Sequence, residues 1–235
     1  NHDILPVIPR QGSVGASGDL APLAHMALPL IGEGLVNFQD RIMPAMLAMK
    51  EVGIDPIILE PKEGLSLING TQVSTAIAIK ACLEAENVLK VADLSGAISV
   101  EASLSSRSVF KSDIHKLKNH PGQRIVASNI WNLLDKSEIV LSHKNCDRLQ
   151  DPYSFRCIPQ VHGISRENYK CAKEIVENEA NSVSDNPLIM PNGKILNSGH
   201  FHAESIAQAM DNLSIAIAEI GSIAERRIHY FMKGI

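Results

Sequence analysis

The chain has 235 residues, with 22 lysines and arginines against 26 aspartates and glutamates, for a formal net charge of −4. A hydrophobic fraction of 45% and a charged fraction of 20% are typical of a globular protein and exclude wholesale disorder. The mild acidity argues against a nucleic-acid partner, because basic surfaces supply most of the affinity for phosphate. No apolar run reaches the ~18 residues that a membrane span requires, so we expect no membrane partner.

The cysteine pattern favours a reducing compartment. Cys82, Cys146, Cys157 and Cys171 form no C-x-x-C pair, and in a chain of this length they do not indicate a disulfide framework. Residues 1–6 lack a basic end followed by an apolar core, so they are not a signal peptide. We therefore expect a cytoplasmic protein.

The first seventy residues are predicted to alternate between loops and short helices. Prolines and glycines punctuate residues 1–15, as in a loop. Apolar residues then recur at helical spacing over 20–31, and Gly32 ends the pattern. A second amphipathic helix is predicted over 41–52, and residues 53–70 are rich in turn formers.

Long helices are predicted after Thr71. One runs to about Ser95 or beyond. Apolar residues at spacings of four and seven predict its buried face, with Leu89 beside it: Val73, Ile77, Ala81, Val88 and Ala92. The run His120-Pro121-Gly122 separates the helices that follow, and residues 136–152 read as a polar connection. A further helix is predicted over 166–181.

The end of the chain carries the clearest pattern. A small hairpin is predicted between 188–190 and 194–196, joined by the turn Pro191-Asn192-Gly193. The last helix has a heptad-like seam: Ile206, Met210, Leu213, Ile217, Ile220 and Ala224. We find no strand-rich region, so the predicted fold is mainly α, with long antiparallel helices in a bundle and elaborate loops. Such seams suggest that other subunits complete the core.

Residues 12–19 form a glycine-rich stretch ahead of the first predicted helix. Their spacing is neither G-x-G-x-x-G nor G-x-x-x-x-G-K, and no βαβ unit surrounds them, so a nucleotide site is disfavoured. They do not form the G-x-S-x-G elbow either. Taken alone, the stretch is a flexible loop that leads into a helix N-cap.

A second interpretation of this loop is chemical. Glycines permit unusual backbone conformations, which would let the nitrogen of Gly18 attack the carbonyl carbon of Ala16. Loss of water from the ring and from Ser17 would leave a methylene group beside a carbonyl. No standard side chain provides such an electrophile, and a helix N-terminus directly after it would add positive potential.

The run over 12–25 resembles the signature of the aromatic amino-acid ammonia-lyases, and within them the members that act on histidine. Three more segments resemble the family's motifs in the same order, namely 69–72, 150–157 and 181–187. Residues 224–228 close the last helix as in the family. The similarity covers essentially the whole chain, and four ordered motifs are far more specific than the tripeptide alone.

The resemblance implies a prosthetic group and a reaction. Ala16, Ser17 and Gly18 would become 4-methylidene-imidazol-5-one (MIO), with no metal. The reaction would remove ammonia and a β-proton from L-histidine to give trans-urocanate. Because the amine is a poor leaving group, bonding to an electrophile makes chemical sense. Asp19 would support formation of the ring, and Asn69 would donate to its carbonyl oxygen as charge develops.

The resemblance also assigns the substrate pocket. Tyr153 would hydrogen-bond near the electrophile or relay a proton, and Arg156 would clamp the substrate carboxylate with its planar fork. Gln150 would line the same pocket, and Phe201 would pack by the substrate ring. Without the resemblance, Tyr153 and Arg156 would be a surface pair, Phe201 would be core and Asn69 would lie in a turn.

The segment 199–203 departs from the family. Its sequence is Gly-His-Phe-His-Ala, where many members have Gly-Asn-Phe-His-Gly. His200, His202 and Glu204 also resemble a metal site, although no distant partner motif supports one. A metal hydrolase at these histidines is therefore a third hypothesis, which predicts bound zinc and sensitivity to chelators.

The resemblance further implies a homotetramer whose active sites draw residues from several subunits. The chain would be the central part of a single lyase domain, with the MIO loop and short helices over 1–70 and the long-helix bundle over 71–235. Residues that the family places before and after this part are missing, so we expect 1–235 alone to be inactive. Open alternatives are a tyrosine or phenylalanine ammonia-lyase, an aminomutase, and a helical scaffold without activity.

Overall fold

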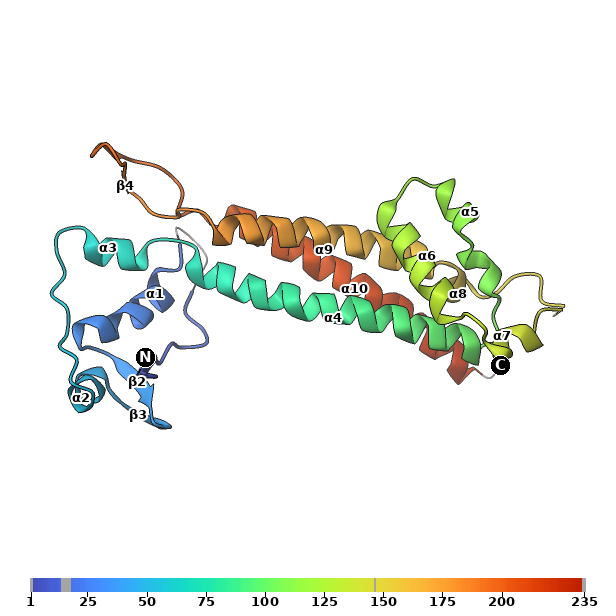
Figure 1. Cartoon of the computed structure of the whole chain (residues 1–235), viewed down its shortest axis with the longest axis horizontal. Helices are drawn as coiled ribbons and strands as arrows, with labels where there is room; N and C mark the ends of the chain where they lie inside the picture. The colour runs from blue at the N-terminus through green and yellow to red at the C-terminus, as the bar shows by residue number, and fades with distance from the viewer. Residues whose placement is uncertain (1, 14–17, 146, 234–235) are drawn as a thin grey trace. The chain divides into compact units, whose positions relative to one another are not determined.

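The computed structural model describes residues 2–13, 18–145 and 147–233. The chain divides into two compact units. We call residues 1–78 with 176–207 the loop unit, and residues 79–175 with 208–235 the helical unit. Most of the described residues are α-helical, which confirms the predicted fold class (Figure 1).

The loop unit contains a small antiparallel sheet that the sequence analysis did not predict. Strand β1 (Leu5–Pro6) pairs with β2 (Leu35–Phe38), which pairs with β3 (Arg41–Pro44). The helix predicted over 41–52 is therefore wrong in its first four residues, and only α2 (Ala45–Glu51) is helical. Edge pairing with β2 overrides the helical pattern there.

The core of this sheet is formed where β2 and α2 meet. The two elements bury four apolar side chains against each other: Val36, Phe38, Ala45 and Ala48. The loop unit also contains α1 (Leu20–Ala27), the 3₁₀ turn η1 (Leu28–Ile31) and α3 (Glu63–Ile68). Helix α1 packs against α3. The helix predicted over 20–31 is confirmed, and Gly32 ends it in a left-handed conformation.

The described part of the chain contains three long helices: α4 (Gln72–Ala102), α9 (Ile158–Ala180) and α10 (Glu204–Met232). In the helical unit, α9 runs antiparallel to α4 and α10 (Figure 1). Leu89 and Ala92 of α4, Tyr169 of α9 and Ile220 of α10 pack together there. The three helices thus form the predicted bundle.

One boundary and one face differ from the prediction. Helix α9 begins at Ile158 rather than at residue 166, because Pro159 lies in its first turn, where proline is tolerated. On α4 the buried face contains Ala78, Cys82, Ala85, Leu89 and Ala92, whereas Ile77 is 66% exposed. Small side chains on this face allow neighbouring helices to approach closely, which a count of bulky residues does not detect.

The seam of α10 is largely as predicted. Ile206, Leu213 and Ile220 are buried, whereas Met210, Ile217 and Ala224 are half-buried. The buried face also contains residues that the prediction omitted, namely Ala209, Ala216 and Ile223. The predicted hairpin is also confirmed, as β4 (Leu188–Ile189) pairs with β5 (Ile195–Leu196).

Short helices surround one end of the bundle in the helical unit. They are η2 (Arg107–Phe110), α5 (Ser112–Lys116), α6 (Pro121–Leu133), α7 (Glu138–Ser142) and α8 (Tyr153–Arg156). Their core includes Phe110, Ile130 and Phe155, packed with Val100 and Ile158 of the long helices. Within the described part of the chain, no helix has the length and apolar character needed to cross a membrane.

Candidate functional site

The structure distributes the predicted site residues over both units. Gly18, Asp19, Asn69 and Phe201 belong to the loop unit, whereas Gln150, Tyr153 and Arg156 belong to the helical unit. Ala16 and Ser17 lie outside the described residues. Three of the four sequence motifs meet in the loop unit, and the fourth forms a separate group.

The carboxylate of Asp19 is the centre of the first group. Asp19 is 1% exposed, and Oγ of Ser13 and Oγ of Ser74 donate to its Oδ1 over 2.9 and 2.7 Å. Its Oδ2 accepts from the backbone N–H of Ser74 over 2.6 Å. Ser74 is the third residue of α4, so this N–H has no partner within the helix. Asp19 therefore caps α4 from another part of the chain, where the helix dipole favours a negative charge.

Gly18 lies where no other residue would fit. It is buried with φ +87°, and a Cβ there would approach the backbone oxygen of Gly70 to 2.8 Å. The N–H of the next residue, Asp19, donates to that same oxygen over 2.9 Å. Gly70 in turn has φ +148°, and a Cβ on it would lie 2.8 Å from the oxygen of Ser184. Backbone segments from three sequence motifs are thus stacked directly on one another.

Asn69 joins the second motif to the third. Its Nδ2 donates to Oδ1 of Asp185 over 3.2 Å and to the backbone oxygen of Asn186 over 3.1 Å. Both partners are acceptors, which fixes the orientation of the amide. The amide hydrogens are therefore used within the chain, and donation by Asn69 to a prosthetic group stays a prediction.

Asp185 is charged and paired in this cluster. It forms an ion pair with Lys62, whose Nζ also donates to Oγ of Ser66 over 2.7 Å. Partial burial raises the pKa of Asp185, but hydrogen bonds from Lys62, the N–H of Asn186 and Asn69 outweigh burial and hold the pKa below its usual value. The carboxylate form is therefore stabilised.

The segment after the hairpin is attached to the same cluster. The N–H of Ser198 donates to Oδ1 of Asn186 over 2.7 Å, and the N–H of His200 donates to Oγ of Ser198 over 3.3 Å. Phe201 follows and is half-buried. Nδ1 of His202 accepts from the N–H of Glu204, and the described residues contain no group of three metal-ligating side chains.

Arg156 and Tyr153 lie together in the helical unit. Tyr153 is 75% exposed, and the guanidinium carbon of Arg156 lies 5.9 Å from the centre of its ring. Nε of Arg156 donates to the backbone oxygen of Asp151 over 2.8 Å. This contact anchors the guanidinium and leaves its two terminal nitrogens as the donors for a carboxylate.

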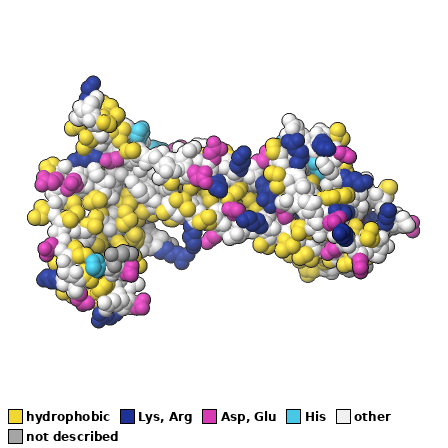
Figure 2. All heavy atoms as spheres, viewed as in Figure 1, with side chains coloured by type: hydrophobic (Ala, Val, Ile, Leu, Met, Phe, Trp, Pro, Cys, Tyr) yellow, Lys and Arg dark blue, Asp and Glu magenta, His cyan; other side chains and the backbone are white. Residues whose placement is uncertain are grey.

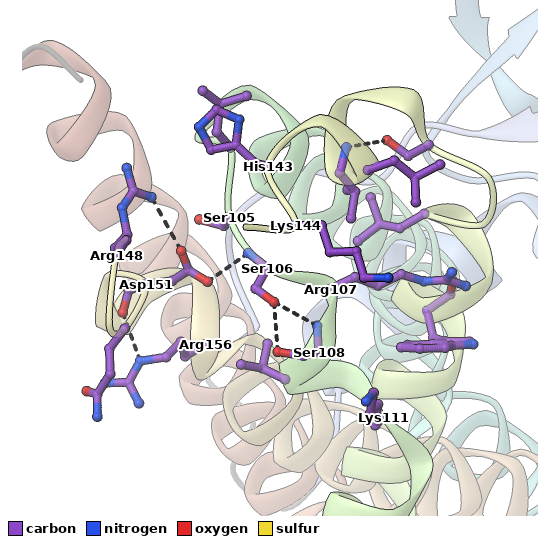
Figure 3. A pocket seen from close by; sticks show the side chains of 18 of the residues that line it. Ser105, Ser106, Arg107, Ser108, Lys111, His143, Lys144, Arg148, Asp151 and Arg156 are labelled. Atoms are coloured by element: carbon purple, nitrogen blue, oxygen red, sulfur yellow. Dashed lines mark hydrogen bonds and ion pairs between the residues drawn. The ribbon is translucent and has the colours of Figure 1, made fainter. Parts of the chain in front are cut away.

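A cavity of about 660 Å³ opens beside Arg156 (Figure 3). Its lining includes Gln150 and five cationic side chains besides Arg156: Arg107, Lys111, Lys136, Lys144 and Arg148. Asp151 is the acidic residue of the lining. Its carboxylate accepts from the N–H of Ser106 over 2.8 Å and from Arg148 over 3.3 Å. The cavity thus favours a negatively charged ligand group.

The sequence analysis missed several residues of the loop-unit cluster. Lys62 and Asp185 form an ion pair although they are 123 positions apart in the sequence. Ser13, in the loop before α1, and Ser74, in α4, both donate to the carboxylate of Asp19. A lone serine or lysine carries no motif of its own. Ser13 and Asp185 lie inside the motifs at 12–19 and 181–187, whereas Lys62 and Ser74 lie outside the motifs and are signalled only by their closeness to 69–72.

The described residues that flank Ala16 and Ser17 fit the predicted condensation. Gly18 has a conformation that L-residues rarely adopt, and its backbone lies against that of Gly70. Ser13 and Asp19, on either side of the segment, are hydrogen-bonded to each other. The described residues on either side of the tripeptide are therefore held close to each other.

Comparison with known proteins connects these features. The family model described as "Aromatic amino acid lyase" matches residues 1–234. The histidine ammonia-lyase of Vibrio cholerae is 52% identical over 97% of this chain and 45% of its own length, and that of Myxococcus xanthus is 47% identical over the same shares. The chain spans under half the length of these relatives.

Solved structures show the same fold. The histidine ammonia-lyase of Trypanosoma cruzi superimposes with a TM-score of 0.85 at 40% identity, over 97% of this chain and 42% of that one. The phenylalanine aminomutase of Pantoea agglomerans superimposes with a TM-score of 0.91 at 34% identity, over 99% and 48%. The fold is thus shared by proteins named for different substrates and reactions.

Proposed function

The chain belongs to the aromatic amino acid lyase family, and from this premise we propose that the whole protein is an ammonia-lyase that converts L-histidine into trans-urocanate. Identity to relatives named histidine ammonia-lyase carries the choice of substrate. It is 47% and 52% for two curated relatives, against 34% for the phenylalanine aminomutase. The phenylalanine aminomutase is therefore less similar to this chain than the two histidine ammonia-lyases are.

We propose that Ala16, Ser17 and Gly18 form the MIO group. When formed, this group would supply the electrophile that makes the substrate's ammonia a better leaving group. Gly18 supports the proposal because it combines burial with φ +87° beside the backbone of Gly70. Asp19 would hold the start of α1 and the start of α4 together around it through Ser74.

Arg156 would bind the substrate carboxylate. Its guanidinium is planar and permanently charged, so it donates two parallel hydrogen bonds to a carboxylate. Gln150 lines the same cationic cavity, and Tyr153 presents its hydroxyl from an exposed position beside Arg156. Phe201 would pack against the substrate ring and Asn69 would stabilise developing charge, as the family resemblance implies.

A homotetramer is part of the proposal. The helical unit exposes large apolar side chains on α4, including Leu83, Val91 and Ile98. Figure 2 shows hydrophobic side chains gathered over the visible face of the loop unit as well. Such exposure exceeds what an isolated subunit needs, so neighbouring subunits would cover it. The chain would then be the central part of one lyase domain, inactive alone, in a cytoplasmic enzyme.

The experiment offers histidine, tyrosine and phenylalanine separately to the full-length protein. Each product is a conjugated acid with its own ultraviolet absorbance, so one spectrophotometric assay follows all three. We expect product from histidine. Rapid turnover of tyrosine or phenylalanine with none of histidine would indicate a tyrosine or phenylalanine ammonia-lyase instead. A β-amino acid product would indicate an aminomutase. No turnover of any of the three substrates would favour a helical scaffold without activity.

A further inference from the structure

We propose that one end of the cavity beside Arg156 is a second binding site, which takes the phosphate group of a small phosphorylated metabolite. We call it the lysine end and define it by four residues of the lining: Arg107, Lys111, Lys136 and Lys144. The inference goes beyond the proposed function, because it concerns the binding of an anion and not the turnover of an amino acid.

The lysine end is separate from the side of the cavity that carries Arg156. In Figure 3, Asp151 and Arg156 lie together on one side of the cavity, whereas Arg107 and Lys111 lie toward the other. Asp151 is the acidic residue of the lining, and its carboxylate already accepts from Arg148 over 3.3 Å. Its negative charge is therefore engaged away from the lysine end.

Arg107 is held in place by contacts within the helical unit. Its Nε donates to the backbone oxygen of Trp131 over 3.0 Å, and its Nη2 donates to Oδ1 of Asp135 over 3.3 Å. Its guanidinium carbon also lies 3.8 Å from the centre of the Trp131 ring. Nη1 has no partner among the described residues, so the chain holds a permanently charged donor with unused hydrogens at this cavity.

The three lysines carry charges that no described residue neutralises. The ammonium groups of Lys111, Lys136 and Lys144 form neither an ion pair nor a hydrogen bond within the described part of the chain. Like charges around one cavity repel one another and raise its positive potential. A bound anion relieves this repulsion, so the lysine end is better suited to an occupied state than to an empty one.

Serine hydroxyls add neutral donors to the same lining. Ser106 and Ser108 share one hydrogen bond between their Oγ atoms over 2.7 Å, so one of the two hydroxyl hydrogens is left for a ligand. Oγ of Ser137 accepts from the N–H of Val140 over 3.1 Å, which leaves its own hydrogen for a ligand as well.

A phosphate group matches these donors better than a carboxylate does. Phosphate is tetrahedral and carries about two negative charges at neutral pH, so it can accept from several lysines at once. A carboxylate is planar and suits the guanidinium fork of Arg156. The cavity volume of about 660 Å³ is that of a small-molecule site. Apolar side chains of the lining would contact the rest of the ligand: Val109, Trp131, Leu134, Val140 and Leu141.

The test is isothermal titration calorimetry of the full-length protein with pyrophosphate in magnesium-free buffer. Pyrophosphate is the probe because it carries phosphate groups and nothing else. Lys111→Gln and Lys136→Gln each remove one charge from an exposed side chain, so both variants should fold as the wild type does. We expect the wild type to bind pyrophosphate saturably, and each variant to bind it about five- to tenfold more weakly.

Lys118→Gln is the matched control. Lys118 is an exposed lysine of the same unit, but it does not line the cavity. This variant changes the net charge of the protein as much as Lys111→Gln does, so it should bind pyrophosphate as tightly as the wild type. An equal loss of affinity in the two variants would show a general effect of charge and would overturn the proposal.

Two further arms locate the anion and identify its chemistry. Unchanged affinity in both Lys111→Gln and Lys136→Gln, with a loss in Arg156→Gln, would place the anion at the substrate side and show the lysine end to be wrong. Citrate presents carboxylates in place of phosphate and should bind more weakly than pyrophosphate. Citrate binding as tight as that of pyrophosphate would show the ligand class to be wrong.

Failure of this inference is distinguishable from failure of the proposed function. If the wild type binds no pyrophosphate, the second site does not exist, and conversion of histidine is unaffected by that result. If the protein turns over no amino acid but binds pyrophosphate through Lys111 and Lys136, the proposed function is wrong and the second site stands.

Discussion

Nδ1 of His162 donates to Oδ1 of Asp93 over 3.0 Å, with both side chains buried in the helical unit. The other carboxylate oxygen of Asp93 accepts from Asn129 over 2.8 Å and from Arg166 over 2.5 Å. The four residues come from α4, α6 and α9. One carboxylate thus links three helices through its hydrogen bonds.

This pair predicts a loss of stability in mild acid. Burial lowers the pKa of His162 and outweighs the opposing effect of Asp93, while Arg227 and Arg166 lower it further. The unfolded histidine takes up a proton below pH ~6.5, whereas the buried ring resists protonation. The free energy of unfolding therefore falls as the pH drops through the unfolded pKa, by up to about 1.4 kcal/mol per pH unit.

The measurement is urea unfolding of full-length protein at several pH values from neutral to mildly acidic, at one protein concentration. The variant His162→Asn keeps a donor near Nδ1 but cannot titrate. We expect its stability to depend less steeply on pH than that of the wild type. Equal slopes for the two proteins would show that His162 does not control the acid response.

Removal of the carboxylate itself should be more costly. Burial raises the pKa of Asp93, but hydrogen bonds from His162 and Asn129 and the charge of Arg166 outweigh burial and keep the pKa low. Asp93→Ala would leave Arg166 without its partner ion. Such changes typically cost about 3–5 kcal/mol, and we expect the lower end because Arg166 is 20% exposed.

The control for Asp93→Ala lies on the same helix. Glu84 pairs with Lys80 over 3.3 Å, but both side chains are well exposed. Glu84→Ala should change the free energy of unfolding by less than ~1 kcal/mol. Comparable losses in the two variants would mean that burial of the Asp93 network contributes nothing.

Helices α6 and α9 approach so closely that two glycines are required. A Cβ on Gly122 would lie 2.2 Å from the backbone oxygen of Gly163, and one on Gly163 would lie 2.5 Å from the nitrogen of Gln123. We expect Gly163→Ala to destabilise the protein by about 1–3 kcal/mol, because the helices must separate. Thermal or urea unfolding measures the loss.

Gly221 provides the opposite case in a long helix. Apart from the surrounding backbone of α10 itself, no described atom lies within 4 Å of a Cβ built there. Gly221→Ala should therefore stabilise α10 by about 0.5–1 kcal/mol through its higher helix propensity. If Gly163→Ala were as stable as Gly221→Ala, the close contact between α6 and α9 would not be a constraint.

The sequence predicts those elements whose signal is local. The seam of α10 repeats every three or four residues from Ile206 to Ala224, and Pro191-Asn192-Gly193 marks the hairpin turn, so the sequence predicts both. The hairpin between β2 and β3 was missed because Gln39 and Asp40 adopt positive φ values of 51° and 59°. That turn normally selects Asn-Gly, and Gln-Asp gives no such signal.

Long-range partners account for the rest of the difference. Asp93 and His162 are 69 positions apart, and Asn69 and Asp185 are 116 apart, so no spacing rule connects them. The buried face of α4 depends on alanines, whose small size matters only once a neighbouring helix is in place. The motifs at 12–19, 69–72 and 181–187 identified the loop-unit site, but only the fold shows which atoms bind which.

Arg156→Lys tests the substrate pocket directly. Lysine keeps the positive charge but loses the planar fork and the Nε bond to the backbone oxygen of Asp151. In the full-length enzyme we expect kcat/KM for histidine to fall about a hundredfold, through loss of the paired hydrogen bonds to the carboxylate. Arg226→Lys is the control, because Arg226 is exposed and pairs only with its neighbour Glu225. A value of kcat/KM for Arg156→Lys within about twofold of the control would remove Arg156 from the substrate site.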